Sequence, residues 1–376
     1  MGKKYSIFIT VLFCAFLFGF GITHFILPDR DFSEQENRYL SQFKAPTFKT
    51  LRSGKFMEDF EDYITDQFPL RDQWIQLKAL SERILGKQEN NGVYFGIDGQ
   101  TLFAQYTAPD PDDLAQRMGF VNTLADNIDV PVYFSIIPDK SWTWADRLPA
   151  NAPNVDNGWT DVTAKSLAGE RVHYIDLYMA LTGNEDFYRT DHHWSTIGAC
   201  QGYLALANAM NNSAAILEYE FTLVSDSFYG TTWSACGAGW IEPDKMYICV
   251  PEGGENGNIT VTRYPEGNPI EGSLYDLSKL EVKDKYSMFL GGNQPQCIIR
   301  NPDGQNGRLL VIRDSYSDSL APFLALDYQE VYLLDLRYVN MMQLNQYVES
   351  NSIDQVLVLY SAFNFSTDGN LFKLAY

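Results

Sequence analysis

The chain has 376 residues, a formal net charge of −20 and only four histidines. Such an acidic protein is a poor partner for nucleic acid, because phosphates are bound by Lys and Arg, so we exclude that class of function. Its content of 45% hydrophobic and 14% aromatic residues is typical of a packed globular protein and excludes general disorder.

A long apolar segment lies near the N-terminus. Residues 7–27 contain no Lys, Arg, Asp or Glu, and as a helix they would span roughly 30 Å, the thickness of a bilayer core. Lys3 and Lys4 precede the segment, which favours a cytoplasmic N-terminus and a body outside the cytoplasm. A cleaved signal peptide is the alternative. We therefore expect residues 1–28 to be a single-pass membrane anchor or a signal peptide, in which His24 has a structural role.

A linker and a helical region are predicted over residues 29–90. Residues 29–50 are polar and contain prolines, which is typical of a linker. Apolar residues then recur at helical spacing from Phe56 to Ile64 and from Trp74 to Leu85. Pro69 separates the two predicted helices. We expect the apolar faces of both helices to be buried, in the core or against each other.

Residues 91–376 predict an α/β domain. Several dense apolar runs are typical of strands that are buried on both faces. Helical stretches lie between several of them, which indicates a mostly parallel sheet covered by helices on both sides. Residues 92–99 predict a hairpin with an Asp-Gly turn, and residues 219–286 predict a β-rich antiparallel insertion. The predicted buried strands are residues 130–137, 171–177, 308–314, 330–336 and 355–360.

Four of the five cysteines follow the apolar segment and allow two disulfides in three pairings. Cys236 and Cys249 belong to the same β-rich segment, so they are the pair that we would test first. The cysteines show no CxxC spacing, so we expect no zinc site.

Chemistry concentrates in residues 188–195, which hold two of the four histidines next to an acid. In an extended segment, residues two apart point to the same side, so Asp191 could orient the imidazole of His193. His192 would then point the other way. Trp194 would line either the substrate site or the core.

Ser315 is the candidate nucleophile that Asp191 and His193 would activate. It follows the predicted strand 308–314 and precedes a predicted helix, so its hydroxyl would lie at the carboxyl end of the sheet, where α/β proteins bind ligands. The N–H groups that begin the helix could stabilise an oxyanion. The alternative is that Ser315 only caps the helix, which the same geometry would permit.

Two further interpretations of the histidine pair stay open. Asp191, His192 and His193 could be polar residues of a tight loop with no chemistry. They could also bind a metal ion, but adjacent histidines in a strand diverge, and His173 is the only other histidine outside the apolar segment. We therefore expect no metal.

The chain resembles the DHHW family of exported bacterial proteins, which is related to the SGNH-hydrolase-like acetyltransferases of alginate O-acetylation. The resemblance lies in Thr190 to Trp194 and in Asp314-Ser315-Tyr316. In the alginate proteins an Asp-x-His-Trp block supplies the acid and base of a triad. Transferred to this chain, that pattern implies Asp191, His193 and Ser315, on a three-layer SGNH-like fold. Further similar segments are residues 32–38, 66–71, 137–140, 228–231 and 289–293.

The chain departs from the related enzymes at two places. SGNH enzymes usually carry Gly-Asp-Ser, whereas this chain has Arg313 before Asp314 and Ser315, and the alginate block usually has one histidine rather than two. Activity could thus be altered while the architecture is kept. Asn293 follows two glycines and could donate to an oxyanion, as an Asn does in SGNH enzymes, although Gly-Gly-Asn is also typical of a plain turn.

These observations predict a membrane-anchored O-acyl transferase or esterase whose body lies outside the cytoplasm. The resemblance implies an acetyl group, a cell-envelope polysaccharide as substrate and a membrane-bound protein as acyl donor. The triad needs no metal or diffusible cofactor. The alternative function is a non-catalytic carbohydrate-binding or assembly protein with a degenerate site. Transfer and hydrolysis need the same triad, so the sequence does not distinguish them.

Overall fold

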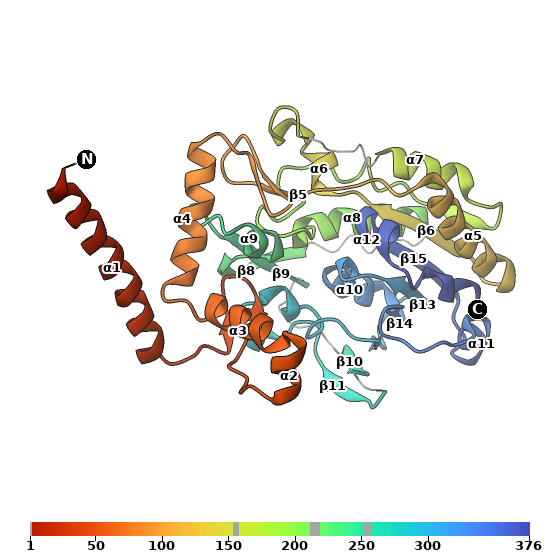
Figure 1. Ribbon diagram of the computed structural model, residues 1–376. Helices are drawn as coiled ribbons and strands as arrows, with labels where there is room; N and C mark the ends of the chain where they lie inside the picture. Colours follow the sequence, from red (N-terminus) through yellow and green to blue (C-terminus); the bar gives the residue numbers. More distant parts are fainter. Residues whose placement is uncertain (1, 153–157, 211–218, 252–257, 266) are drawn as a thin grey trace. The chain divides into compact units, whose positions relative to one another are not determined.

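The computed structural model describes residues 2–376 except 153–157, 211–218, 252–257 and 266 (Figure 1). Its contacts divide the chain into two units. Unit 1 comprises Met1–Asn91 and Ser234–Trp240, and unit 2 comprises Gly92–Trp233 and Ile241–Tyr376. The predicted boundary after residue 90 lies one residue from this division.

A mixed eight-stranded sheet forms the centre of unit 2. Its strand order is β11-β10-β12-β14-β13-β15-β6-β7. The strands from β14 to β7 are parallel, and the remaining neighbours pair antiparallel. The five parallel strands correspond to the five predicted runs. The strand bounds are β6 Val132–Ile137, β7 Val172–Tyr174, β10 Thr260–Arg263, β11 Ile270–Gly272, β12 Gln296–Arg300, β13 Asn306–Arg313, β14 Tyr328–Leu334 and β15 Gln355–Ser361.

Helices cover both faces of this sheet, as β13 shows most directly. Leu309 and Val311 belong to one hydrophobic core, and Leu310 and Ile312 belong to the other. Because successive strand residues face opposite sides, a strand buried on both faces must be apolar throughout. The predicted three-layer α/β fold is confirmed. The first core is covered by α8 (Thr196–Ala209) and α10 (Tyr316–Asp327), and the second by α5 (Pro111–Asn127), α7 (Gly158–Leu167), α11 (Leu344–Ser350) and α12 (Ala362–Thr367).

The β-rich insertion divides between two sheets. β8 (Tyr219–Phe228) and β9 (Asp244–Pro251) form an antiparallel pair of their own. β10 and β11 instead extend the main sheet. β12 pairs antiparallel with β14, and β10 then pairs antiparallel with the free edge of β12 and is followed by β11. The insertion is thus β-rich as predicted, but part of it belongs to the main sheet. Residues 252–257 and 266 of this range lie outside the described residues.

The predicted hairpin is present and extends further than expected. β4 (Val93–Phe95) pairs antiparallel with β5 (Leu102–Ala104). Gly99 lies in the connection with φ 74°, a conformation in which glycine carries no steric cost. The short elements that follow are α6 (Lys140–Thr143), α9 (Thr231–Cys236), η1 (Ala145–Arg147), η2 (Leu277–Glu281), η3 (Lys285–Met288) and η4 (Leu371–Ala375).

Unit 1 begins with α1 (Lys3–Ile26), which is long and apolar enough to cross a membrane. The predicted linker contains a small antiparallel pair, β1 (Phe32–Ser33) with β2 (Arg38–Tyr39). Arg38 forms an ion pair of 2.5 Å with Asp66, and this hydrogen-bonded partner holds the pKa of Asp66 at about 2. Two of the family-like segments, residues 32–38 and 66–71, therefore contact each other. The other elements are α2 (Phe48–Ser53), α3 (Lys55–Asp66), α4 (Arg71–Ile84) and β3 (Glu89–Asn90).

The expected burial of the apolar face of α4 is wrong. Leu77, Leu80 and Ile84 are exposed, and Ala79 is the only buried residue of the helix. The reason is that α4 turns a different side toward the rest of unit 1, where Gln76 donates a hydrogen bond to Gln35. The apolar stripe is left outside.

The predicted disulfide is also wrong. All five cysteines are free thiols. Cys249 packs into the same core as Cys200 and Cys297, and Cys236 does not belong to that core. Burial raises the pKa of Cys200 to about 11 and that of Cys249 to about 12, so both stay protonated and inert.

Candidate active site

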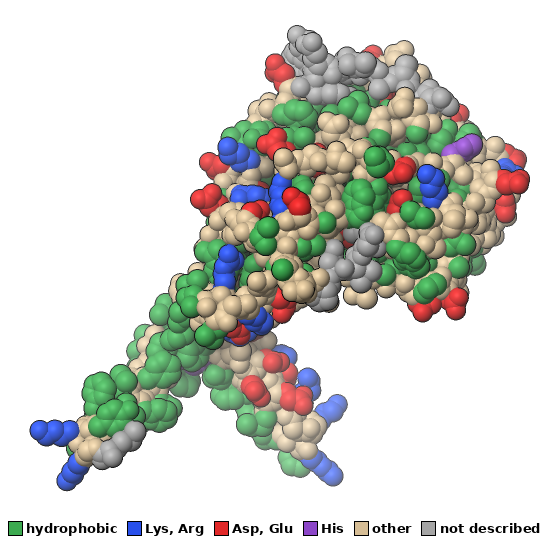
Figure 2. Space-filling model, turned by 90° about the horizontal axis from the view of Figure 1, so that it is seen from above, with side chains coloured by type: hydrophobic (Ala, Val, Ile, Leu, Met, Phe, Trp, Pro, Cys, Tyr) green, Lys and Arg blue, Asp and Glu red, His purple; other side chains and the backbone are tan. Residues whose placement is uncertain are grey.

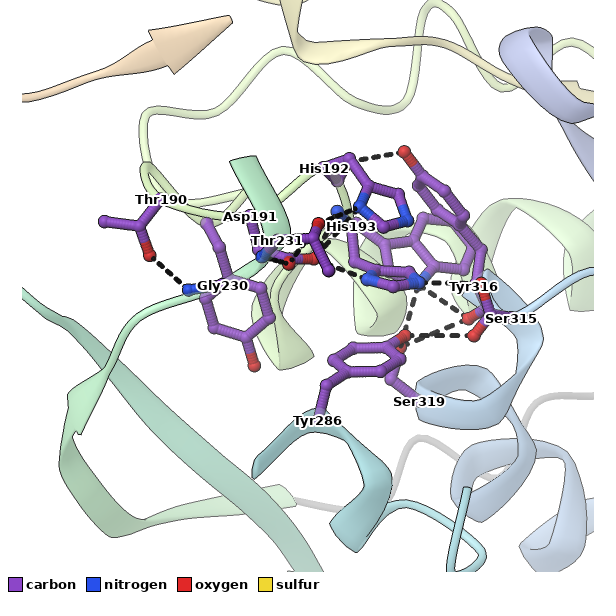
Figure 3. Close-up of polar contacts among 12 residues, drawn as sticks. Thr190, Asp191, His192, His193, Gly230, Thr231, Tyr286, Ser315, Tyr316 and Ser319 are labelled. Atoms are coloured by element: carbon purple, nitrogen blue, oxygen red, sulfur yellow. Dashed lines mark hydrogen bonds and ion pairs between the residues drawn. The ribbon is translucent and has the colours of Figure 1, made fainter. Parts of the chain in front are cut away.

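Ser315 lies at the carboxyl end of β13, immediately before α10. Its side chain makes no capping hydrogen bond. Instead, its Oγ lies 2.7 Å from Nε2 of His193 (Figure 3). The amide of Tyr316 donates to Asp314 Oδ1. The side chain of Asp314, and not that of Ser315, therefore caps the N-terminus of α10. The capping alternative therefore does not account for the serine hydroxyl.

The backbone around His193 bends where the sequence suggested an extended segment. Oδ1 of Asp191 accepts hydrogen bonds from the backbone N–H of His193 at 3.0 Å and from its Nδ1 at 2.5 Å. The acid and base thus meet through a local turn rather than through strand alternation. Asp191, His193 and Ser315 form the predicted hydrogen-bonded series, and their catalytic role stays a prediction.

The hydrogen bonds define where the protons of this series lie. Besides the two bonds from His193, Asp191 accepts from the backbone N–H and the hydroxyl of Thr231 at 2.6 and 2.9 Å. Burial acts to raise the pKa of Asp191, but His192, His193 and these hydrogen bonds outweigh it and hold the pKa well below its usual range. An ionised Asp191 requires the proton of His193 on Nδ1. Nε2 is then an acceptor for the Ser315 hydroxyl, as a general base must be.

His192 lies beside His193 rather than pointing away from it, which corrects the expected divergence. The two ring centroids are 3.9 Å apart, because the bend brings both side chains over Asp191. Nδ1 of His192 lies 2.7 Å from the Thr231 hydroxyl. That hydroxyl already donates to Asp191, so His192 must donate to it and carry its proton on Nδ1. Burial and the neighbouring His193 lower the pKa of His192, so it is neutral near pH 7.

The same cluster has donor atoms that could hold a metal ion. Ligand atoms of Asp191, His192 and His193 all lie within 4.8 Å of one another. However, both Asp191 oxygens, Nδ1 of each histidine and Nε2 of His193 have the partners given above. An ion would have to replace several of these hydrogen bonds. The geometry therefore favours the hydrogen-bonded series of Asp191, His193 and Ser315 over a metal centre.

Tyr286, from η3, packs against the base and was not identified from the sequence. Its ring stacks on His193 with centroids 3.8 Å apart and planes 10° apart. Its hydroxyl donates to the carbonyl of Ser315 and bonds the hydroxyl of Ser319, each at 3.1 Å. One side chain from the insertion thus holds both the imidazole and the beginning of α10 (Figure 3). Only its position in the β-rich insertion hinted at this.

Lys140 fixes the loop that carries the acid. Its ammonium is buried and donates to the carbonyls of Tyr188, Arg189 and Asp191 at 2.9, 3.0 and 2.6 Å. Three carbonyls converge on one cation, so Lys140 determines the path of the backbone into Asp191. The signal available in the sequence was its family-like segment 137–140.

Gly230 makes room for the acid. A Cβ at this position would lie 2.2 Å from Cβ and 2.3 Å from Oδ2 of Asp191, a distance that real side chains do not tolerate. The amide of Gly230 donates to the hydroxyl of Thr190, which in turn donates to Asp244. The family-like segment 228–231 therefore forms the wall against which Asp191 lies.

Asp314 and Arg313, which precede the serine, are held by hydrogen bonds and by an ion pair. Oδ2 of Asp314 accepts from the backbone N–H and hydroxyl of Ser361 and from the Asn364 side chain at 2.7–2.8 Å. The fully buried guanidinium of Arg313 lies 2.9 Å from Asp318 of α10. Arginine in place of the usual glycine thus adds an ion pair under the helix, away from the Ser315 hydroxyl.

The two lower-ranked site residues have other partners. Trp194 is fully buried, and its indole N–H donates to the carbonyl of Tyr316 and to Ser319. We therefore assign Trp194 to packing beneath α10 rather than to substrate contact. Asn293 is exposed, and its Oδ1 accepts from Arg313 at 3.3 Å. An oxyanion role for Asn293 stays a prediction.

Solved structures share the fold. A crystal structure of a DHHW family protein from Eubacterium siraeum superposes with a TM-score of 0.64 at 21% identity, covering 76% of this chain and 95% of that one. Bacillus cereus PatB1 with a sulfonyl adduct gives a TM-score of 0.62 at 22% identity, covering 74% and 96%. At these identities the likeness shows the fold alone.

One curated relative is similar in sequence. The probable alginate O-acetylase AlgJ of Pseudomonas aeruginosa is 26% identical over 168 residues, which is 42% of this chain. The match covers 43% of AlgJ, less than half of its length. The model of the DHHW protein family matches residues 120–334, more than half of the chain and both parts of the site. The chain therefore belongs to the DHHW family.

Proposed function

We propose that this protein is an O-acyl transferase, with acetyl as the transferred group, that acts on a polysaccharide outside the cytoplasm. The observation that carries the proposal is the hydrogen-bond series from Asp191 through His193 to Ser315, with the tautomer of His193 suited to a base. The similarity to a probable alginate O-acetylase supports acetyl and polysaccharide. α1, with Lys3 and Lys4 before its apolar part, supports an anchor with the body outside.

The chemistry would proceed in two balanced steps. Ser315 attacks the acyl carbonyl of the donor while His193 takes the hydroxyl proton, and the imidazolium then protonates the departing group. Asp191 stabilises that imidazolium. In the second step His193 takes a proton from the acceptor hydroxyl, which attacks the acyl-serine ester, and Ser315 regains its proton. A sugar hydroxyl as acceptor gives transfer, and water gives hydrolysis.

Other groups would stabilise the charges that develop in these steps. The N–H groups of Tyr316, Ser317 and Asp318 at the start of α10 already donate to Asp314 or to the carbonyl of Ser315. The backbone N–H of Ser315 itself is therefore the first candidate donor to the oxyanion. Asn293 is a second candidate donor. A membrane-bound protein is the candidate source of the acyl group, because α1 would keep the site near a membrane. No step requires a metal or a diffusible cofactor.

Labelling of Ser315 by a sulfonyl fluoride tests the proposal. The probe suits a serine activated by a base, and a sulfonyl adduct of the structurally similar PatB1 has been solved. We expect the intact mass of the wild-type protein to increase by one adduct, located on Ser315 by peptide mapping. Ser315→Ala and His193→Ala should lose the adduct, because the first lacks the nucleophile and the second the base.

Ser366 provides a control, because its hydroxyl donates to the carbonyl of Ala362 and hydrogen-bonds the hydroxyl of Tyr106 rather than an imidazole. Ser366→Ala should label like the wild type. An unmodified wild-type mass, under conditions that label a control serine esterase and with a smaller activated ester also unreactive, would favour the non-catalytic alternative. Glycan binding should persist in His193→Ala under either function, so it is the labelling that distinguishes the two.

A further inference from the structure

The helix α4 has an apolar stripe on its outer face. Along one side of Arg71–Ile84 lie large apolar side chains, interrupted only by Gln73 and Ser81. A soluble helix places such a stripe toward the core, and contiguous exposed apolar surface usually marks an interaction site. The stripe and its flanks comprise Leu70 (60% exposed), Trp74 (38%), Leu77 (53%), Leu80 (41%), Ile84 (76%) and Leu85 (86%).

The inner face of α4 explains why the helix does not rotate to bury this stripe. Gln76 donates to Gln35, and a side chain at Gly239 would collide with Gln76 at 2.4 Å. The guanidinium of Arg83 lies over the ring of Trp240, 5.0 Å from its centroid. Gln76 and Arg83 thus contact the rest of unit 1 on the inner face of α4. These contacts hold the apolar stripe on the opposite, outer face.

Contacts with α1 indicate what covers the stripe. The ring of Trp74 lies 5.7 Å from that of Phe20 and 6.2 Å from that of Phe16. Phe20 also stacks on Phe68, which precedes α4. Both phenylalanines belong to α1, which is long and apolar enough to cross a membrane and whose surface is largely hydrophobic (Figure 2). The α4 stripe therefore continues the surface of the candidate membrane span.

The depth of this contact can be estimated from helix geometry. Phe20 lies six residues before Ile26, the end of α1, which corresponds to about 9 Å along the helix axis. Trp74, in contact with Phe20, would then lie within the outer leaflet. The charged Lys78, on the flank of the stripe, would reach the headgroup region, as long cationic side chains do at interfaces.

We propose that α4 is an interfacial helix whose apolar stripe is covered by the acyl chains of the outer leaflet. The inference rests on the anchoring part of the proposed function, namely that α1 crosses the membrane, and is independent of the chemistry at Ser315. The protein would be held by α1 and α4 together.

Fluorescence quenching in nanodiscs tests this proposal with the full-length chain. Single cysteines are introduced at Leu77 on the stripe, at Lys78 on its flank and at Phe13 in α1, each in a Cys14→Ala background, and labelled with bimane. The four remaining cysteines are buried, and the background protein measures their residual labelling. Nanodiscs with one copy of the protein contain lipid with a nitroxide on the acyl chain or on the headgroup.

We expect the acyl-chain nitroxide to quench the label at Leu77→Cys at least twofold more than the label at Lys78→Cys. As an independent measurement, brominated lipid should quench the tryptophan emission of the wild type more than that of Trp74→Phe. Leu77 and Lys78 are both exposed, so circular dichroism should show that the variants keep the fold.

Two results would overturn the proposal and can be distinguished. If Phe13→Cys is quenched but Leu77→Cys is not, the anchor stands and the stripe faces something other than lipid, such as a second copy or a membrane-embedded partner. If neither position is quenched, α1 does not lie in the membrane and the anchoring part of the function fails as well. Neither result bears on the proposed chemistry at Ser315.

Discussion

His192 and His193 are neighbours with different hydrogen-bond partners, so their removal should have different effects. His193 joins Asp191 to Ser315, whereas His192 donates to Thr231. We expect His193→Ala to reduce kcat/KM for an activated acetyl ester by roughly 10³-fold or more, because Ser315 loses its base. His192→Ala should keep a substantial fraction of the turnover. Thermal unfolding of both variants serves as the control for folding.

The opposite order of activities would mean that His192 is the base. The hydrogen bond between Ser315 and His193 would then be a resting arrangement that changes when substrate binds. Equal losses in both variants with normal unfolding would instead indicate that the two imidazoles act as one unit.

At the scale of elements, the carboxyl ends of neighbouring parallel strands bring several acids together. Asp139 follows β6, and its Oδ2 is buried with no hydrogen-bond partner among the described residues. Burial, and then the charge of Asp314, raise the pKa of Asp139 to about 7. The folded state therefore keeps a proton that the unfolded chain releases near pH 4. The contribution to stability is complete below pH 4 and is lost as the pH rises toward 7.

Asp139→Asn should remove this pH dependence. We expect the variant to be more stable than the wild type at pH 8, by up to about 4 kcal/mol for a shift of about three pKa units, and to differ little at pH 4. The measurement is chemical unfolding of both proteins from pH 4 to 8. A difference that stays constant across this range would show that Asp139 has the same pKa in both states.

For the whole molecule, the main prediction concerns topology. Lys3 and Lys4 precede the apolar part of α1, so the N-terminus should stay in the cytoplasm and the body should lie outside. A protease added outside intact cells should degrade the chain after about residue 30, while a cytoplasmic marker protein survives. Protection of the C-terminal body in intact cells, with degradation after permeabilisation, would reverse the orientation.

The free cysteines are compatible with either compartment. Because Cys200, Cys249 and Cys297 are buried in one core and Cys236 lies outside that core, they neither support nor oppose export. The protease experiment, and not the state of the cysteines, therefore decides on which side of the membrane the body lies.

Local patterns in the sequence predicted the α/β class, the five parallel strands, the apolar N-terminal helix and the turn that presents Ser315. Each depends on periodicity or on residues close together in the chain, such as the apolar run of β13. Asp191 and His193 were paired correctly, but from a wrong premise, because a bend rather than an extended strand joins them.

Only the tertiary structure decided the contacts between distant residues. Tyr286 reaches His193 across 93 positions, as their numbers 286 and 193 give, and no local pattern marks a tyrosine that will stack on an imidazole. The facing of α4 was predicted incorrectly for the same reason. Periodicity shows that a helix has an apolar face, but the partner that covers this face depends on the rest of the chain and on the membrane. The sequence thus determines the secondary-structure elements and the types of side chain available for chemistry, while packing determines which side chains meet.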